Sequence, residues 1–216
     1  MQEDRLVVVV ASGATGNPQP EEHDALVIAA DGGVDAARVL GLHVDVLVGD
    51  LDSATPQAVA AAEGDGVEVV RHPARKDATD LELALDEASA RGAHRILVRL
   101  APGGRLDHAL SGFLLLAHER FAGTTIDAAA GPALIHVVRS SRTLTGAVGE
   151  TVTLLPVGGP AHGVTASGLE YPLHGETLEA GSTRGVSNTF REPVAHVSVS
   201  RGVVLAIRPE ADRTVA

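Results

Sequence analysis

Three polar clusters in the chain contain side chains that could hold a metal ion and a phosphate. Asp31 and Gly32 directly follow the apolar run LVIAA, and the segment GDLDS, with Asp50 and Asp52, follows VDVLV. The segment GGRLDH follows a third run, ILVRL. Because the carboxyl ends of parallel strands share one edge of a sheet, we expect the three clusters to converge where open α/β sheets bind ligands.

The two aspartates of GDLDS are candidate ligands of a divalent cation. Asp50 and Asp52 are two residues apart, so in extended backbone both carboxylates project to the same side and can share one hard ion. Mg²⁺ is the expected ion. An isolated pair with this spacing is more often a turn cap beside a solvated acid, but the neighbouring clusters favour a metal site.

The segment KDATD adds acids and an ammonium group at the start of a predicted helix. Thr79 and Glu82 have the spacing of a capping box, and Asp77 and Asp80 lie where the helix dipole favours negative charge. Capping alone would account for these acids. However, Lys76 offers a cation for a phosphate, and free amides at a helix start bind anions, so the combination predicts a metal and phosphate site.

The segment GGRLDH combines features suited to a phosphorylated ligand. Gly104 lets the backbone approach a ligand closely, and the Arg105 guanidinium can bind phosphate through two hydrogen bonds. Asp107 and His108 lie at the start of a predicted helix. Glycines alone would indicate only a strand-to-helix turn. The loop Ser12–Asn17 is a weaker candidate for ligand contact, because turns of its composition are common.

Composition excludes several classes of protein. The chain of 216 residues has no cysteine, which rules out a disulfide framework and thiolate metal sites. Its formal charge of −11 argues against a nonspecific nucleic-acid binder, which needs cations to displace counterions. No apolar run approaches the roughly 20 residues of a membrane helix, and the start MQEDRLVVVV has acids where a secretory signal has bases before its apolar core. We expect a cytoplasmic protein without nucleic-acid or membrane partners.

The first part of the chain predicts an α/β domain. From Leu6 to about Ala130, short apolar runs alternate with stretches of helical period, which is typical of a largely parallel sheet with flanking helices, a Rossmann-like nucleotide-binding domain. The expected strands cover residues 6–11, 25–30, 44–48, 67–70, 96–100 and 124–128. The expected helices cover residues 34–40, 56–63 and 106–120, with another starting near Thr79.

The second part predicts an all-β domain. After about Gly131 the chain consists of short alternating segments, TLTGAV, ETVTLLPV, HGVTASGL, AHVSVS and VVLAIRP, separated by Gly and Pro. A β-sandwich or an open barrel fits this pattern. Two polar segments, GLEYPL and GSTRGVSNT, lie among these strands, and taken alone they indicate turns, with Tyr171 a core residue at a strand edge.

Six motifs in fixed order resemble the thiamine pyrophosphokinase family: AADGG, GDLDS, KDATD, GGRLDH, GLEYPL and GVSNTF, from about Ala25 to Phe190. The resemblance implies an α/β domain over residues 1–135 that binds ATP and Mg²⁺, and a thiamine-binding β-sandwich over residues 136–216. It further implies a homodimer whose active site lies between the nucleotide domain of one subunit and the sandwich of the other. The implied reaction transfers the pyrophosphoryl group of ATP to the thiamine hydroxyl and releases AMP.

The resemblance also assigns roles to residues. The implied metal ligands are Asp31, Asp50, Asp52 and Asp80. The implied nucleotide-binding residues are Asp31, Gly32, Lys76, Thr79, Gly104, Arg105, Asp107 and His108. The implied catalytic residues are Asp52, Asp77, Asp80 and Arg105, with Asp77 the candidate base. Ser187 and Asn188 are implied to contact thiamine from the partner subunit.

The chain departs from the family pattern at points that bear on the acceptor more than on the chemistry. Leu51 stands where relatives often have Phe, the stretch GPAL after the sixth expected strand is less polar, and Trp is absent. One alternative is therefore a pyrophosphokinase that acts on another alcohol, such as a pterin. A metal-dependent glycosyltransferase leaves KDATD and GGRLDH unexplained. A sensor of nucleotide or thiamine is the nonenzymatic alternative.

Overall fold

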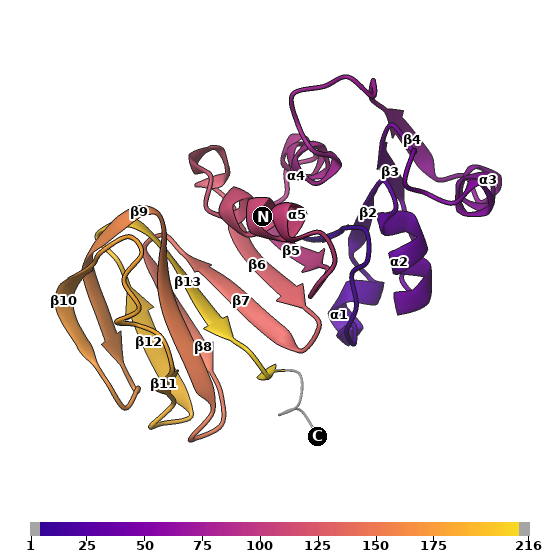
Figure 1. Ribbon diagram of the computed structural model, residues 1–216. Coiled ribbons are helices and arrows are strands. Elements are labelled where there is room, and N and C mark those ends of the chain that lie inside the picture. The colour runs from indigo at the N-terminus through magenta and orange to yellow at the C-terminus, as the bar shows by residue number, and fades with distance from the viewer. Residues whose placement is uncertain (1–4, 212–216) are drawn as a thin grey trace. The chain divides into compact units, whose positions relative to one another are not determined.

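The computed structural model describes residues 5–211 and divides the chain into two compact units (Figure 1). Unit 1 runs to Leu115 and includes Gly123–Gly131, while unit 2 comprises Leu116–Ala122 and the chain from Pro132 onward. The expected domain boundary between residues 135 and 136 stays a prediction. Within residues 5–211, no helix is long and apolar enough to cross a membrane.

Unit 1 is built on parallel strands in the order β4-β3-β2-β1-β5-β6. The strands are β1 (Leu6–Val10), β2 (Leu26–Ala30), β3 (Val46–Gly49), β4 (Glu68–Arg71), β5 (Arg95–Leu100) and β6 (Thr125–Ala130). The central strands are buried on both faces, which explains why they are continuous apolar runs: residues 7–10 of β1 are at most 2% exposed. The largely parallel N-terminal sheet is therefore confirmed.

Helices cover both faces of this sheet, with α2 and α3 on one face and α4 on the other (Figure 1). The helices are α1 (Pro20–His23), α2 (Gly33–Leu40), α3 (Pro56–Gly64), α4 (Asp80–Ala90) and α5 (Leu106–Leu116). The 3₁₀ helix η1 (Glu119–Phe121) follows α5 and belongs to unit 2. The Thr79 side chain accepts a hydrogen bond of 3.2 Å from the Glu82 amide, so Thr79 caps α4 as expected. Helix α1 has no counterpart among the expected helices.

The predicted helix over residues 106–120 is too long. Helix α5 ends at Leu116, and His118 has extended backbone with ψ 136°. The His118 ring accepts a hydrogen bond from the Arg120 amide and caps η1. Capping by a side chain thus starts a second, shorter helix where the apolar period alone predicts continuation.

Unit 2 is antiparallel and β-rich, as expected. Its strands are β7 (Ala133–Val138), β8 (Ser141–Thr145), β9 (Thr151–Ser167), β10 (Leu173–Leu178), β11 (Asn188–Thr189), β12 (Val194–Ser198) and β13 (Arg201–Arg208). The segments ETVTLLPV and HGVTASGL were expected as separate strands but form the single 17-residue strand β9. Gly158 and Gly159, at φ 75° and 149°, lie at an irregularity in the pairing with β13, and beyond them β9 pairs also with β10 and β12. Buried residues from β7, β8, β9, β12 and β13 form one core.

Candidate metal and phosphate site

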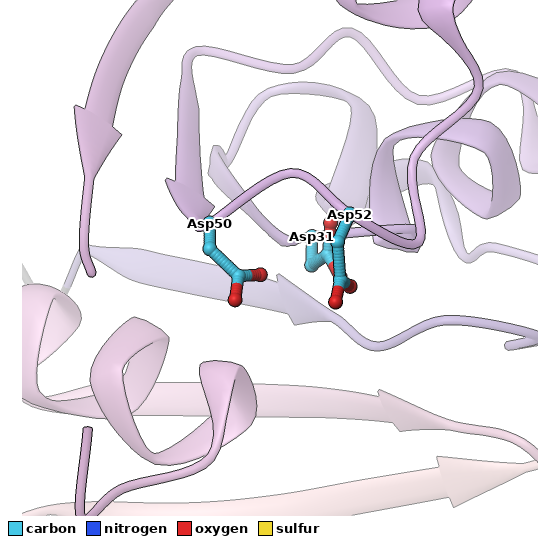
Figure 2. Close-up of side chains that lie close together, drawn as sticks. All are labelled: Asp31, Asp50 and Asp52. Atoms are coloured by element: carbon cyan, nitrogen blue, oxygen red, sulfur yellow. The ribbon is translucent and has the colours of Figure 1, made fainter. Parts of the chain in front are cut away.

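Three carboxylates converge at the carboxyl ends of neighbouring strands in unit 1. Asp31 follows β2, while Asp50 and Asp52 follow β3, and one oxygen of each lies within 4.8 Å of the others. Figure 2 shows Asp50 and Asp52 on one loop with their carboxylates directed the same way, and Asp31 beside Asp52. The structure thus brings together the acids of the first two sequence clusters. We call Asp31, Asp50 and Asp52 the acidic cluster.

The backbone of the GDLDS loop differs from the expected extended form. Leu51, between the two aspartates, has φ 66°, so a left-handed turn and not strand alternation places both carboxylates on one side. Gly49 has φ 146°, and a Cβ there would lie 2.8 Å from Asp80 Oδ1 and 3.1 Å from the Asp31 Cβ. Glycine at this position therefore allows Asp80 and Asp31 to approach the loop closely.

Asp31 is the buried member of the acidic cluster. Asp31 is only 5% exposed, and its Oδ2 accepts a hydrogen bond of 3.2 Å from the Ser53 amide. Oδ1 is buried and has no hydrogen-bond partner within residues 5–211. Burial raises the pKa of Asp31 and the charges of Asp80 and Asp52 add to the increase, against the opposing hydrogen bonds of Ser53. One buried oxygen is therefore available to a ligand.

Lys76 supplies a positive charge beside the cluster. Its Nζ lies 2.7 Å from Asp80 Oδ1 and 3.4 Å from Asp50 Oδ2. Burial by itself would lower the pKa of Lys76, but the hydrogen bonds and charges of Asp80 and Asp50 outweigh burial and raise it. Asp31, Asp50, Asp52 and Asp80 give four negative charges against one ammonium, a formal balance of −3. Such a site favours a further cation.

The third sequence cluster forms a separate exposed pair. Arg105 donates to Asp107 through Nη2 at 2.6 Å and Nε at 3.2 Å, and this hydrogen bonding lowers the pKa of Asp107 to about 2. Across residues 5–211, no hydrogen bond or ion pair joins either side chain to the acidic cluster. His108 and Asp77 are exposed, and nothing lies within 4 Å of a Cβ built on Gly104. Asp77, Gly104 and His108 are therefore accessible to a ligand from solvent.

In unit 2, Asn188 has a structural role that its sequence motif did not reveal. Asn188 is 5% exposed, and its amide accepts from the Tyr171 and Thr189 amides at 3.0 and 2.9 Å and donates to the Tyr171 carbonyl at 2.8 Å. Asn188 thereby holds GLEYPL beside GVSNTF. Tyr171 is 68% exposed, so the expectation of a core residue at a strand edge is wrong. Ser187 is exposed at φ 61°, and its amide donates to Thr153 Oγ1.

Two serines beside the acidic cluster lie in segments that the sequence indicated only as a whole, Ser12 in the loop Ser12–Asn17 and Ser53 in GDLDS. A Cβ on Gly32 would lie 2.8 Å from Ser12 Oγ and 3.0 Å from the Ser53 carbonyl oxygen, so both residues pack against the glycine that follows Asp31. The two serines therefore leave no space for a side chain at position 32. The signal for Ser12 was its position directly after the first strand, where a ligand loop of a parallel sheet begins.

A parallel sheet with carboxylates at its carboxyl edge, followed by a β-rich unit, defines a class of two-domain α/β proteins whose sheet edge can bind a charged ligand. The catalytic-domain model of thiamin pyrophosphokinase matches residues 19–127, and the vitamin B1 binding-domain model of the same enzyme matches residues 135–204. The chain belongs to the thiamine pyrophosphokinase family.

Individual relatives agree with this assignment. Thiamine pyrophosphokinase of Bacillus subtilis is 28% identical over 190 residues, covering 82% of this chain and 85% of the relative. A crystal structure of the Bacillus subtilis enzyme matches with a TM-score of 0.80 at 25% identity, covering 94% of this chain and 98% of that one. Yeast thiamin pyrophosphokinase, at 13% identity, shares the fold with a TM-score of 0.76 over 100% of this chain and 89% of that one.

Proposed function

We propose that the chain transfers the pyrophosphoryl group of ATP to the hydroxyl of thiamine, giving thiamine diphosphate and AMP, with Mg²⁺ held at the acidic cluster. The family assignment supports this thiamine diphosphokinase reaction. The structural observation that carries the proposal is the convergence of Asp31, Asp50 and Asp52 within 4.8 Å. The matches support neither a pterin acceptor, nor a glycosyltransferase, nor a sensor.

The residues of the cluster fit a magnesium ion. All three offer carboxylate oxygens, the ligand type that Mg²⁺ prefers, and the buried Asp31 Oδ1 has no other partner in the described chain. Asp31, Asp50 and Asp52 would hold the ion, and Asp80 would face it from the start of α4. When bound, Mg²⁺ supplies charge neutralisation at the triphosphate oxygens.

The neighbouring residues position the substrates in this proposal. Lys76, already charged beside the cluster, donates a hydrogen bond to a phosphate oxygen. Arg105 gives up its ion pair with the exposed Asp107 and binds the triphosphate instead. Gly32 and Gly104 let the backbone approach the nucleotide, with Thr79, Asp107 and His108 around it. Asp77, exposed beside Lys76, accepts the proton of the thiamine hydroxyl.

Three further assignments belong to the same proposal. Unit 1 is a nucleotide-binding domain of Rossmann-like type, which the switch in strand order beside β1 favours. The protein acts as a homodimer in the cytoplasm. In the dimer, Ser187 contacts thiamine, while Asn188 shapes that surface by fixing the backbone of Tyr171.

The test is the identity of the nucleotide product. Protein incubated with ATP, Mg²⁺ and thiamine should release AMP and thiamine diphosphate in equal amounts, measured by ion-exchange chromatography. Omitting thiamine, or chelating the metal with EDTA, should stop AMP release. ADP as the sole nucleotide product would contradict the proposal, and AMP release with a pterin alcohol but not with thiamine would reassign the acceptor.

A further inference from the structure

A buried ion pair in unit 1 lies outside the residues proposed for the reaction. Arg99 of β5 is 2% exposed and Glu22 of α1 is 0% exposed. Arg99 donates to the Glu22 carboxylate through Nε at 2.6 Å and Nη2 at 2.5 Å. Replacing such a pair with apolar side chains of similar volume is often neutral or stabilising, because burying two charges is costly. Stability alone therefore does not account for this pair.

The pair binds backbone on both sides of a short proline-containing segment, NPQP. Arg99 Nη2 donates to the Asn17 carbonyl oxygen at 3.1 Å, and Glu22 Oε1 accepts from the Gln19 amide at 2.8 Å. The Gln19 side-chain amide also donates to the Asn17 carbonyl oxygen, but over a longer distance of 3.5 Å. Arg99 and Glu22 thus fix the point where the chain leaves the loop Ser12–Asn17, which we call the β1 loop.

The first residue of the β1 loop, Ser12, lies beside the acidic cluster. Ser12 packs against Gly32, the residue after Asp31. Near the last residue of the loop, Gly16 has φ 120°, and a Cβ there would lie 2.9 Å from the Gly131 carbonyl oxygen and 3.3 Å from Arg99 Nη1. The β1 loop therefore runs from the acidic cluster to the guanidinium, with no space for a side chain where it passes Arg99.

We propose that Arg99 and Glu22 are positioning residues that hold the β1 loop as one wall of the ATP site. This inference rests on the proposed pyrophosphokinase function. Without the pair, the loop loses the Arg99 hydrogen bond at Asn17, and ATP must then order the loop further as it binds. A contact made equally in the ground state and the transition state changes KM and leaves kcat nearly unchanged. The pair thus sets the affinity for ATP and not the rate of transfer.

The test replaces both charges together. The double variant Arg99→Met/Glu22→Leu removes the anchor without leaving a charge unpaired, so the protein should stay folded and its melting temperature should change little from that of wild type. Its affinity for ATP with Mg²⁺, measured by calorimetry, should fall about tenfold, and KM for ATP should rise to match. The kcat should change less than about twofold, and KM for thiamine should not change.

Two more variants make the result decisive. Arg99→Lys keeps the charge but cannot hold Glu22 and Asn17 in the same geometry, so it should show a smaller loss of ATP affinity. If the double variant does not fold, this variant carries the test. The control is Glu150→Leu/Arg208→Met in unit 2, which removes a pair of similar burial, with side chains 8% and 11% exposed. It should leave ATP affinity unchanged.

Unchanged ATP affinity in Arg99→Met/Glu22→Leu, or an equal loss in the control, would overturn the inference. Either result leaves the proposed function intact, because wild type would still release AMP. Failure of wild type itself to release AMP with thiamine would instead refute the proposed function.

Discussion

Asp31 carries a conflict between stability and function. It is 5% exposed, has φ 47°, and keeps one buried oxygen without a hydrogen-bond partner in the described chain. Burial raises its pKa, which means that folding disfavours the ionised carboxylate. Groups placed in this way are typical of functional sites, where binding compensates for a local loss of stability.

Asp31→Asn should therefore stabilise the metal-free protein at neutral pH while abolishing turnover. The folded-state pKa of Asp31 is raised, so wild type loses stability as the pH rises from about 3.9 through that pKa, and the variant does not. Asn also tolerates positive φ and can accept the Ser53 hydrogen bond. Urea unfolding across pH should show the advantage of the variant disappear in acid. A variant less stable than wild type at pH 7 would contradict this account.

Asp52 presents the opposite case, because it is exposed and its loss should affect only the chemistry. Asp52→Asn should lower turnover about 100-fold or more, the scale seen when one group that stabilises charge is removed. The free energy of unfolding should change by less than about 0.5 kcal/mol. Asp65→Asn, at an exposed aspartate after α3, is the matched control and should be fully active. Equal activity of the two variants would contradict a role for Asp52 in the reaction.

The sequence was sufficient to predict that Asp31, Asp50 and Asp52 meet, because strand ends in a parallel sheet share an edge, but it wrongly added Asp107, which pairs with Arg105 instead. It could not show how the three acids meet, because the left-handed turn at Leu51, whose side chain packs against the core of unit 1, has no local sequence signal. It also could not show that Asn188 binds the backbone of Tyr171, because that contact joins residues 17 positions apart. The roles of individual residues in the site stay proposals.

At the scale of secondary-structure elements, the buried strands of unit 1 were predictable because each is an apolar run between polar turns. The strands of unit 2 were less predictable from the sequence. Strand β9 contains Gly158, Gly159 and Pro160, which ordinarily indicate a break, yet its partners β13, β10 and β12 hold the strand through them. Tertiary pairing thus overrides the local signal in β9.

The packing of α2 against the end of β1 gives a prediction at this scale. A Cβ on Gly33 would lie 2.0 Å from the Val10 carbonyl oxygen, so Gly33→Ala must push the helix away from the strand. We expect a loss of about 1–3 kcal/mol in the free energy of unfolding, measured with urea. Gly64→Ala, at the end of α3 with open space around it, should be neutral or slightly stabilising. Equal changes in the free energy of unfolding for Gly33→Ala and Gly64→Ala would show that α2 can shift away from β1 without loss of stability.

At the scale of the whole molecule, the two units have their own cores, and unit 2 contains a buried pair of its own. Arg208 donates to Glu150 through Nε at 2.6 Å and Nη2 at 3.0 Å. Burial alone would raise the pKa of Glu150, but the hydrogen bonds from Arg208 and the Ala147 amide outweigh burial and lower it. The pair therefore stabilises unit 2 above the ordinary glutamate pKa of about 4.3, and this stabilisation is lost as the pH falls through the lower folded-state value.

Glu150→Gln should reduce the free energy of unfolding at pH 7 by about 2 kcal/mol, because it leaves the Arg208 charge without its partner. The difference from wild type should shrink as the pH falls from the ordinary glutamate pKa of about 4.3 through the lower folded-state pKa of Glu150. Glu63→Gln is the control, since the Arg71–Glu63 pair is 57% and 53% exposed and contributes little. A constant difference at all pH values would contradict a charge-based role for Glu150.

The central claim for the molecule is that both terminal phosphates of ATP move together to thiamine. The most direct measurement uses ATP labelled at the β-phosphate, with Mg²⁺ and thiamine, and follows the label by chromatography. We predict that the label appears in thiamine diphosphate and that the released nucleotide is unlabelled AMP. Recovery of the label in ADP would show that only the terminal phosphate is transferred, and would contradict the account.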